Sequence, residues 1–447
     1  MIKISSRQLA LAMIIVPAIF YLVNYVLLGF NFNGWEFSMI IIISVVTCFQ
    51  YIENDDYLNP IIYFPILYFL IYWIGNFSMG YSDVPKTMWI YYLIGLFGFY
   101  VGAFFANRIS VKVPLGEDND YLEHGARRIF VFIYCICILA KMVIFTINGV
   151  PLLASNIDAS RQAAAESFGV LKVISGAHTI LAVYFFYDLV MKKIKFKSIT
   201  LLNTIIIACS FMLAILDVSR LLIIQMILPM LFIIIVKVHK IKLIRIIEIA
   251  LFLLVFIGAN KFIRNSLENP AYLAYVTQNR GASLFSNIML SGFSSFRVAI
   301  DDLRLLINTV PTHHGYTYGE MFFNSVFSFL PGKQIVIGYY VADLLGMKFD
   351  GMGAATTILG MFYLDGGVLL IFWGMFLFSF FIMVNYRKYI KYSNVTIHSL
   401  LSIYIIYYSI LCLRTNVMPT IEPLLNMFYF ITFSFIAKKI RVKVVNL

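Results

Sequence analysis

The stretch SITLLNTIIIACSFMLAILDVSRLLIIQMILPMLFIIIV, residues 198–236, decides the fold of this chain. It holds two apolar runs, 198–216 and 221–236, on either side of the short polar segment DVSR, and neither run contains a charged residue. A helix of about 20 mainly apolar residues can cross a bilayer, because its backbone polar groups are satisfied within the segment. The stretch therefore predicts two membrane-spanning helices joined by a turn at the membrane surface.

The same pattern recurs along the whole chain, in which 61% of the residues are hydrophobic and only 13% are charged. An ordinary soluble domain has roughly 25% charged residues, so this composition excludes a water-exposed globule. We predict an all-α, polytopic transmembrane helical bundle of about twelve spans. The predicted span cores are 9–29, 37–52, 60–77, 87–106, 129–146, 170–191, 198–216, 221–236, 246–263, 354–383, 395–412 and 424–437.

The basic residues predict how the bundle is oriented. They cluster at 192–197, 237–245, 387–391 and 438–443, and Arg127 and Arg128 precede a span on the same predicted side. Short cytoplasmic loops retain Lys and Arg, so these clusters lie inside when the N-terminus is inside. We expect a multi-pass protein of the cytoplasmic membrane with both termini inside.

Charge and cysteine usage narrow the partners. The net charge of +12 is dispersed over separate short loops, so we expect membrane lipid headgroups and no nucleic acid as its partners. All five cysteines fall in or at the edge of apolar runs, and no Cys/His spacing predicts a zinc site. We predict neither a metal nor a cofactor.

Two long connections stand out on the predicted outer side. The first is the outer loop 148–169, which lies between two of the spans in 1–263. Its sequence SNIDASRQAAAES predicts a short interfacial helix. The largest connection, 264–353, is too apolar for an independent soluble domain, so we expect short helices packed on the membrane face, with Pro331-Gly332 between two of them. The last spans occupy 354–447.

Arginine is frequent among the cations that this topology leaves outside. Its planar, permanently charged fork binds phosphate or carboxylate oxygens in pairs, and outward positive charge is otherwise disfavoured. The pattern indicates an anionic ligand at the outer surface. The arginines concerned are Arg161, Arg220, Arg264, Arg280, Arg297, Arg304 and Arg414.

Two of these arginines have the best-defined positions. Arg220 ends the DVSR turn, among the helix ends at the membrane surface. Arg264 follows the predicted span 246–263, and Lys261, three residues earlier, shares its helix face. We predict catalytic roles for Arg220 and Arg264 and a substrate-binding role for Lys261.

Each of these predictions has a structural alternative. Arg220 lies three residues after Asp217 and can pair with it, while Arg297 and Arg304 can form a salt-bridge ladder with Asp301. The other outer arginines can pair with carboxylates or with lipid phosphates. The outer tyrosines, Tyr316 and Tyr318 among them, suit sugar binding by stacking and hydrogen bonding, but they also suit the headgroup belt of any membrane protein.

Other ionisable residues have open assignments. His313 and His314 in PTHHGYTYGE can act as bases, or they can belong to a surface turn between Pro311 and Gly315. Lys141 and His178 lie inside predicted spans, where an ionisable side chain is a functional candidate, although no acid partner for Lys141 is evident. The outer carboxylates include Asp301, Asp302, Glu320 and Asp365, and none is singled out.

Several stretches together resemble the bacterial oligosaccharide repeat-unit polymerases, the Wzy-type O-antigen polymerase family, and more loosely the O-antigen ligases. The resemblance covers span number, inner termini and the two enlarged outer loops. The matching stretches are LDVSRLLIIQM (216–226), ANKFIRNSL (259–267), FNSVFSFLPGK (323–333) and GAATTILGMFYLDGG (353–367).

The resemblance implies an undecaprenyl-diphosphate-linked oligosaccharide as donor and a sugar hydroxyl of a second lipid-linked unit as acceptor. It also implies inverting, metal-independent transfer that builds O-antigen, capsule or exopolysaccharide, with a chain-length regulator protein as a candidate partner. Fixed guanidinium groups can stabilise the charge that develops on the departing diphosphate. We expect Arg220 and Arg264 to act there, supported by Arg161, Arg280, Arg297 and Arg414, with Tyr316 and Tyr318 near the sugars.

Three alternatives remain. Ligases of the wider group carry a histidine near the GAATTILG stretch, where this chain has Ala354 to Thr357, and this argues against a ligase. A flippase or transporter of lipid-linked oligosaccharide also needs interior cations, but it usually buries them midway through paired repeats. A structural or partner-binding membrane protein would not need the arginines.

Overall fold

The computed structural model describes residues 58–77, 86–110, 124–154, 169–191, 197–237, 284–321, 337–347, 353–388 and 396–414, with residue 323 and single positions within 248–263 and 428–435. Over these residues the protein is all-helical, without strands. The helices are α3 (Pro60–Phe77), α4 (Lys86–Arg108), α5 (His124–Asn148), the 3-10 turn η2 (Pro151–Leu153), α7 (Gly169–Met191), α8 (Lys197–Leu216), α9 (Arg220–Lys237), α12 (Leu284–Thr309), α14 (Ile337–Leu344), α15 (Thr357–Tyr386) and α16 (Thr396–Arg414).

The predicted apolar runs between 60 and 236, and those at 354–383 and 395–412, are confirmed as helices. The single positions described within 246–263 and 424–437 are helical as well. The runs 9–29 and 37–52, the predicted helix in loop 148–169 and the Pro331-Gly332 break lie outside the described residues.

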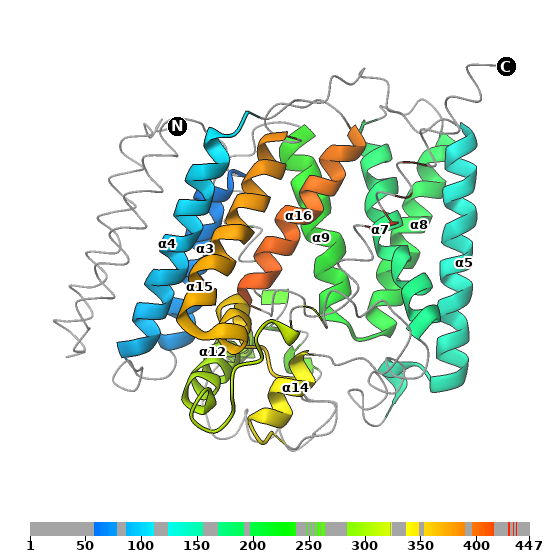
Figure 1. Cartoon of the computed structure of the whole chain (residues 1–447). Coiled ribbons are helices and arrows are strands. Elements are labelled where there is room, and N and C mark those ends of the chain that lie inside the picture. Colours follow the sequence, from blue (N-terminus) through cyan, green and yellow to red (C-terminus); the bar gives the residue numbers. More distant parts are fainter. Residues whose placement is uncertain are drawn as a thin grey trace.

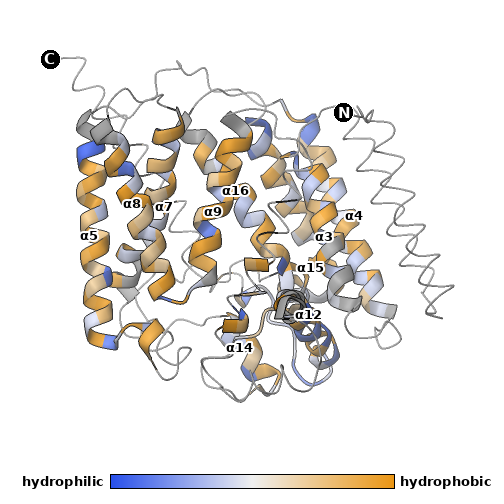
Figure 2. Ribbon diagram, turned by 180° about the vertical axis from the view of Figure 1, so that it is seen from behind, coloured by the Kyte–Doolittle hydropathy of each residue, from blue (hydrophilic) through white to orange (hydrophobic). Residues whose placement is uncertain are grey.

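Apolar helices give the described chain the character of a membrane protein. The segments Thr87–Arg108, Arg127–Leu153 and Thr357–Tyr386 are long and apolar enough to cross a membrane. Large hydrophobic side chains are exposed along them, such as Phe132 and Leu139 of α5 and Leu369 and Leu377 of α15. Figure 2 shows hydrophobic residues along nearly the whole length of the helices. Lipid tails are the medium in which such faces are stable.

Among the described helices, α4 and α15 share the most extensive contact, and their backbones meet at glycines of α4. A Cβ atom on Gly98 would lie 2.5 Å from the carbonyl oxygen of Phe372, and one on Gly102 would lie 2.2 Å from that of Phe376. The two glycines form a GxxxG pair, which lets membrane helices approach closely when no hydrophobic effect drives them together.

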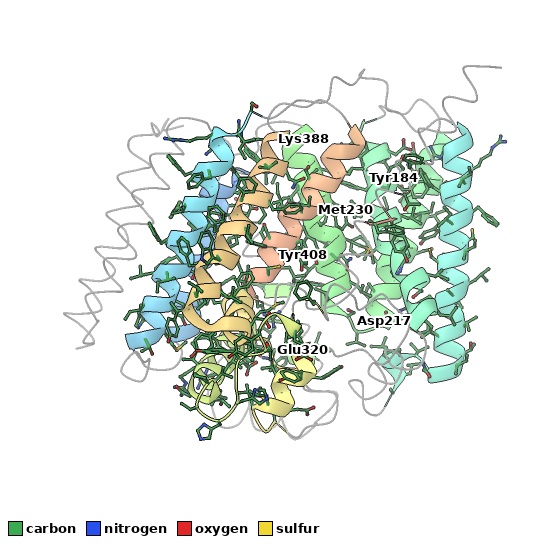
Figure 3. The ribbon with its side chains drawn as sticks, viewed as in Figure 1. Tyr184, Asp217, Met230, Glu320, Lys388 and Tyr408 are labelled. Carbon is green, nitrogen blue, oxygen red and sulfur yellow. The ribbon has the colours of Figure 1, made fainter. Side chains whose placement is uncertain are left out.

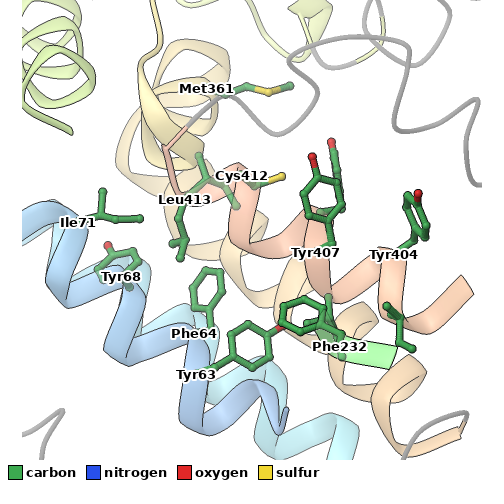
Figure 4. Packing of buried hydrophobic residues seen from close by; sticks show 14 of the residues in the cluster. Tyr63, Phe64, Tyr68, Ile71, Phe232, Met361, Tyr404, Tyr407, Cys412 and Leu413 are labelled. Atoms are coloured by element: carbon green, nitrogen blue, oxygen red, sulfur yellow. The ribbon is translucent and has the colours of Figure 1, made fainter. Parts of the chain in front are cut away.

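Aromatic side chains fill the space among α3, α4 and α16. Phe64 of α3 stacks on Phe99 of α4 at 4.2 Å between ring centroids. Tyr63 of α3 shares a hydrogen bond of 2.6 Å with Ser409 of α16. Figure 4 shows Phe64 of α3 beside Leu413 of α16, with Tyr63 pointing toward Phe232. These contacts join α16, late in the chain, to the earliest helix described.

A second group of helices, α5, α7, α8 and α9, packs together and reaches the first group through α9 and α16. Arg127, which the sequence places just before the span 129–146, has a structural role here. It lies in α5, is 8% exposed, and pairs with Asp188 of α7 at 3.1 Å and with the Asn203 amide oxygen of α8. A buried guanidinium needs such partners, so Arg127 holds three helices together.

The two ends of the bundle differ. α12 and α14 lie at the end where α8 ends, α9 begins and α16 ends, and we call this the capped end (Figure 1). Figure 3 places Asp217 and Glu320 toward the capped end and Lys388 at the opposite one. We call the opposite end the basic end. Arg387 there donates hydrogen bonds to the carbonyl oxygens of Ala106 and Ile109, the former at the C-terminus of α4 and the latter just beyond it.

The prediction of short helices in 264–353 is wrong for α12, which has 26 residues. Its buried residues Ala299, Ile300, Leu303 and Leu306 recur at helical spacing, and this apolar face packs against α3 and α15. α14, with eight residues, is short as expected. α12 can be long because it lies on the bundle and needs no turn to stay in contact with it.

α15 is broken near its start. Gly366 and Gly367 leave the helical conformation, and Gly367 has φ +63° and ψ −149°, a region that is essentially restricted to glycine. The predicted span 354–383 is therefore a short helical segment and a longer one. The break lies at the capped end, where the segment 310–321 contacts it.

Candidate functional site

The turn between α8 and α9 presents Arg220 at the capped end. The amide of Ser219 donates to the Ala214 carbonyl at 3.2 Å and that of Val218 to Ile215 at 2.9 Å, a Schellman closure of α8. Val218 has φ +51°, which is unfavourable for a β-branched residue. The Ser219 hydroxyl accepts the Leu222 amide at 3.4 Å and so caps α9.

Arg220 is thus the first residue of α9, and its side chain lies outside the described residues. A cation at a helix N-terminus is opposed by the helix dipole, which favours anions there. Helix stability therefore gives no reason for arginine at this position. Binding of an anion at the same point would give one.

Asp217, the expected structural partner of Arg220, forms an ion pair with Lys141 of α5. Lys141 is 8% exposed and also lies 5.2 Å from the Phe145 ring centroid. This answers the open question about Lys141, whose acid partner is 76 residues away in sequence. The pair joins α5 to the first residue of the turn that leads into Arg220.

Arg414 is the last residue of α16 and is half-buried at the capped end. α16 runs antiparallel to α9 and packs against it, and the hydroxyl of Tyr404 donates to the Gln225 carbonyl at 3.5 Å. The first residue of α9 and the last residue of α16 therefore lie at one end of neighbouring helices. Two of the arginine positions predicted for the site are brought to the same side of the bundle.

Lys261 is half-buried in the helical positions of 261–263. Three residues before it, a Cβ on Gly258 would lie 2.2 Å from the carbonyl oxygen of Ile288, so this stretch runs against the first turns of α12. Lys261 itself interacts with other groups of the protein. Arg264, Arg161 and Arg280 lie outside the described residues.

Arg297 forms the ladder that the sequence offered as its structural alternative. It donates to Asp301 at 3.4 Å, and Arg304 approaches the same carboxylate at 3.6 Å. All three side chains are at least partly exposed on α12. An exposed ladder of this kind contributes little to stability, and one carboxylate shared by two arginines leaves net positive charge.

The segment 310–321 is attached to the break in α15. The backbone amide of Thr317 donates to the Leu364 carbonyl at 3.0 Å, and its hydroxyl donates to Asp365. Tyr316 is half-buried, and its hydroxyl would be 2.8 Å from a Cβ on Gly367, so only glycine fits beneath it. Tyr318, by contrast, is 84% exposed and has φ +50°.

The two tyrosines predicted to bind substrate therefore differ. Tyr316 packs edge-on against Tyr363 at 6.0 Å and fills the space beside the helix break. Tyr318 presents its ring to the surroundings from a strained backbone position, and such strain persists only where neighbouring contacts impose it. Tyr318 is the better placed of the two to contact a ligand.

His313 and His314 lie in an exposed turn, as the surface-turn interpretation proposed. The Nδ1 atom of His314 is 2.9 Å from the Gly315 carbonyl oxygen, and its Nε2 atom is 3.4 Å from the Tyr340 hydroxyl of α14. Burial raises the pKa of Tyr340, with a further contribution from the Glu320 charge. His314, Tyr340 and Glu320 thus form a polar group near Tyr318. His178, in contrast, is buried inside α7, with its Nδ1 atom 2.6 Å from the Ser175 carbonyl oxygen.

Asp302 was not singled out by the sequence, yet it is buried on the apolar face of α12. It is 3% exposed and accepts the Ala355 amide at 2.8 Å, which ties α12 to the segment leading into α15. Desolvation raises its pKa to about 6, opposed by the Ala355 hydrogen bond and increased by the Asp301 charge. Asp302 lies three residues after Ala299 and four before Leu306, so it falls on the apolar face of the helix. This spacing could have identified Asp302 as a buried carboxyl from the sequence.

This carboxyl predicts a pH-dependent stability. Because the pKa of Asp302 is raised in the folded state, its protonation contributes its full stabilisation below about pH 4. This contribution is lost as pH rises through about 6. On this account stability falls by roughly 3 kcal/mol across that window, and Asp302→Asn should remove most of the fall. Thermal unfolding midpoints of both proteins, measured from about pH 4 to about pH 7, test this. Parallel curves for the two proteins would contradict it.

The capped end therefore combines arginine positions on α9, α12 and α16 with an exposed tyrosine and a group of hydrogen-bonding side chains. Such a surface can hold an anion and a polyhydroxylated ligand together. Among the described residues, no group of three or more His, Cys, Asp or Glu side chains is arranged to hold a metal ion. No family model, curated protein or solved structure matched the chain when it was compared with known proteins.

Proposed function

We propose that the protein polymerises undecaprenyl-diphosphate-linked oligosaccharide units at the outer face of the cytoplasmic membrane. The observation that carries the proposal is that α9 begins with Arg220 and α16 ends with Arg414 at one end of packed helices, beside α12 and α14. A diphosphate linked to a membrane lipid would be presented at such a boundary, with its sugars directed toward the cap.

The proposal includes a topology of about twelve spans with both termini inside. It is supported by the separation of the two ends of the bundle. Arg108, Arg387 and Lys388 lie at the basic end, as cytoplasmic positions should, and the capped end lies opposite. The capped end then faces outward, where flipped lipid-linked units would be available.

The chemistry requires stabilisation of a leaving group. Transfer breaks the bond between the anomeric carbon and the phosphate oxygen, so negative charge grows on the diphosphate while the acceptor hydroxyl loses its proton. Arginines fixed at helix ends near an apolar region stabilise that charge more effectively than the same groups in water. Arg220 and Arg264 are proposed to do this, with Arg414 and Lys261 binding the diphosphate beside them.

The acceptor is proposed to lie against the exposed group of the cap. Tyr318 offers an open aromatic face, while Glu320, Tyr340 and His314 offer hydrogen-bonding groups at the same capped end. Sugars combine an apolar ring face with hydroxyl groups, and this surface has both features. We propose that it orients the acceptor unit.

A flippase of the same lipid-linked sugar is the second candidate. Two buried ion pairs, Arg127–Asp188 and Lys141–Asp217, favour it, because transporters often carry ionisable groups within the membrane. In each pair, however, the two opposite charges neutralise each other. A flippase would also give no role to α12 and α14 at the capped end.

The two candidates predict different intermediates. Deletion of the gene from a cell that makes the polymer should leave single lipid-linked units exposed outside and no polymer, because export continues while joining stops. The units can be detected by a membrane-impermeant sugar-oxidising label and by gel analysis of the polymer. Units confined to the inner leaflet would reject the polymerase in favour of the flippase. Polymer of normal length attached to its final carrier would reject both.

A further inference from the structure

Three polar contacts at a regular interval join α5 to α8 and to the turn that follows α8. Arg127 pairs with Asn203, Tyr134 with Ser210 at 3.0 Å, and Lys141 with Asp217. In each contact the two residues are 76 positions apart, and they recur every seven residues along α5 and along 203–217, which covers most of α8 and the first residue after it. A seven-residue repeat keeps side chains on one face of a helix, so the two helices run parallel and in register.

The first two contacts lie wholly between helices. Arg127 also reaches Asp188 of α7, and the Tyr134 hydroxyl also donates to the Ile206 carbonyl at 2.9 Å. Polar contacts of this kind join helices in an apolar medium. Their role is accounted for by the association of α5, α7 and α8.

The third contact differs because Asp217 is outside the regular helix. It begins the turn in which Val218 holds a left-handed conformation and Ser219 caps α9. A strained residue such as Val218 costs about 1–3 kcal/mol and keeps its conformation only if its surroundings impose it. Lys141 supplies such a constraint from a neighbouring helix. Arg220 is the next residue after this turn.

We propose that Lys141 is a positioning residue that fixes the place of Arg220 through Asp217. The proposal rests on the polymerase assignment for its catalytic meaning, but the positioning itself does not. Lys141 is buried and holds the acid that begins the turn, and the turn sets where the guanidinium of Arg220 can reach. A misplacement of about 1 Å can lower a reaction rate about a hundredfold, so the effect should be measurable.

The first test measures the position without using activity. Arg220→Cys is introduced into a chain whose five native cysteines are replaced by alanine, and a water-soluble maleimide is added to the purified protein in detergent micelles, where both ends of the bundle are accessible. Adding Lys141→Met should change the labelling rate at position 220 by about fivefold or more, whereas Lys141→Arg should restore it to within about twofold. The matched control is Tyr134→Phe, which removes the equivalent hydroxyl contact with Ser210 from the same face of α5 without leaving a buried charge, and it should leave the rate unchanged.

A second variant guards against simple misfolding. Lys141→Met combined with Asp217→Leu removes both charges, so no unpaired charge stays buried and the protein should fold. It should still alter labelling at position 220, because the turn has lost its tie to α5. Equal labelling rates in this variant, in Lys141→Met and in the control would overturn the proposal.

Kinetics then test the catalytic meaning with Arg220 intact. Lys141→Met should lower kcat for polymer formation about tenfold or more and leave KM for the lipid-linked donor within about twofold, with Lys141→Arg close to the unaltered protein. Equal losses in kcat for Tyr134→Phe and Lys141→Met would show that only helix association matters and would overturn the proposal. If the unaltered protein forms no polymer, the polymerase assignment fails, while the labelling result still decides whether Lys141 positions residue 220.

Discussion

Replacing Arg220 by alanine is expected to lower the rate of polymer formation by a factor on the order of a thousand. The guanidinium would act on charge that exists fully only after the glycosyl–phosphate bond begins to break, so its loss should appear mainly in kcat. Purified protein in lipid vesicles, supplied with lipid-linked repeat units, gives the measurement. Arg220→Lys should keep part of the activity, because it keeps the charge and loses the paired geometry.

A matched control comes from the opposite end of the same helix. Lys237 is the last residue of α9, so Lys237→Ala removes one positive charge from α9 without touching the capped end. It should leave polymer formation within about twofold of the unaltered protein. Normal polymer from Arg220→Ala, or equal losses in the two variants, would remove Arg220 from the proposed site.

The helices were predictable because membrane spans are decided by composition over a local window. Runs such as 60–77 and 198–216 contain almost nothing that water could stabilise, and the structure makes each of them a helix. Periodicity within α12 was equally readable, but the connection 264–353 was expected to form only short helices. The length of α12 follows from packing against α3 and α15, which no local window contains.

The candidate site was predictable in type and only partly in detail. The DVSR turn does place Arg220 at a helix end, because a four-residue break between two spans leaves no other geometry. The partner that the structure shows for Asp217, Lys141, lies 76 residues away and could not be predicted, because that pairing is set by the alignment of α5 with α8. Tyr316 and Tyr318, two residues apart, look alike in sequence and differ only once Gly367 opens space beneath one of them.

The close contact of α4 with α15 could also have been read from the sequence, since Gly98 and Gly102 form a GxxxG pair in an apolar run. It matters for the site, because α15 carries the break to which Thr317 and Tyr316 are attached. A change in how α4 packs would shift α15, and with it the segment 310–321 that is attached to the break in α15. Stability and function should therefore both respond to these glycines.

Gly102→Ala is expected to destabilise the folded protein by about 3 kcal/mol, because the added methyl group would lie 2.2 Å from the Phe376 carbonyl oxygen and 2.1 Å from the Ser379 hydroxyl. Neither atom can move without shifting the backbone of α15 or breaking the Ser379 hydrogen bond to Phe376 at 3.0 Å. Gly176→Ala in α7 is the matched control, since nothing lies within 4 Å of its added Cβ and helix propensity then favours alanine. Reversible unfolding in mixed detergent micelles measures both. A Gly102→Ala protein as stable as Gly176→Ala would mean that α4 and α15 do not pack through this glycine face, and the attachment of the cap to α15 would then have to be explained without α4.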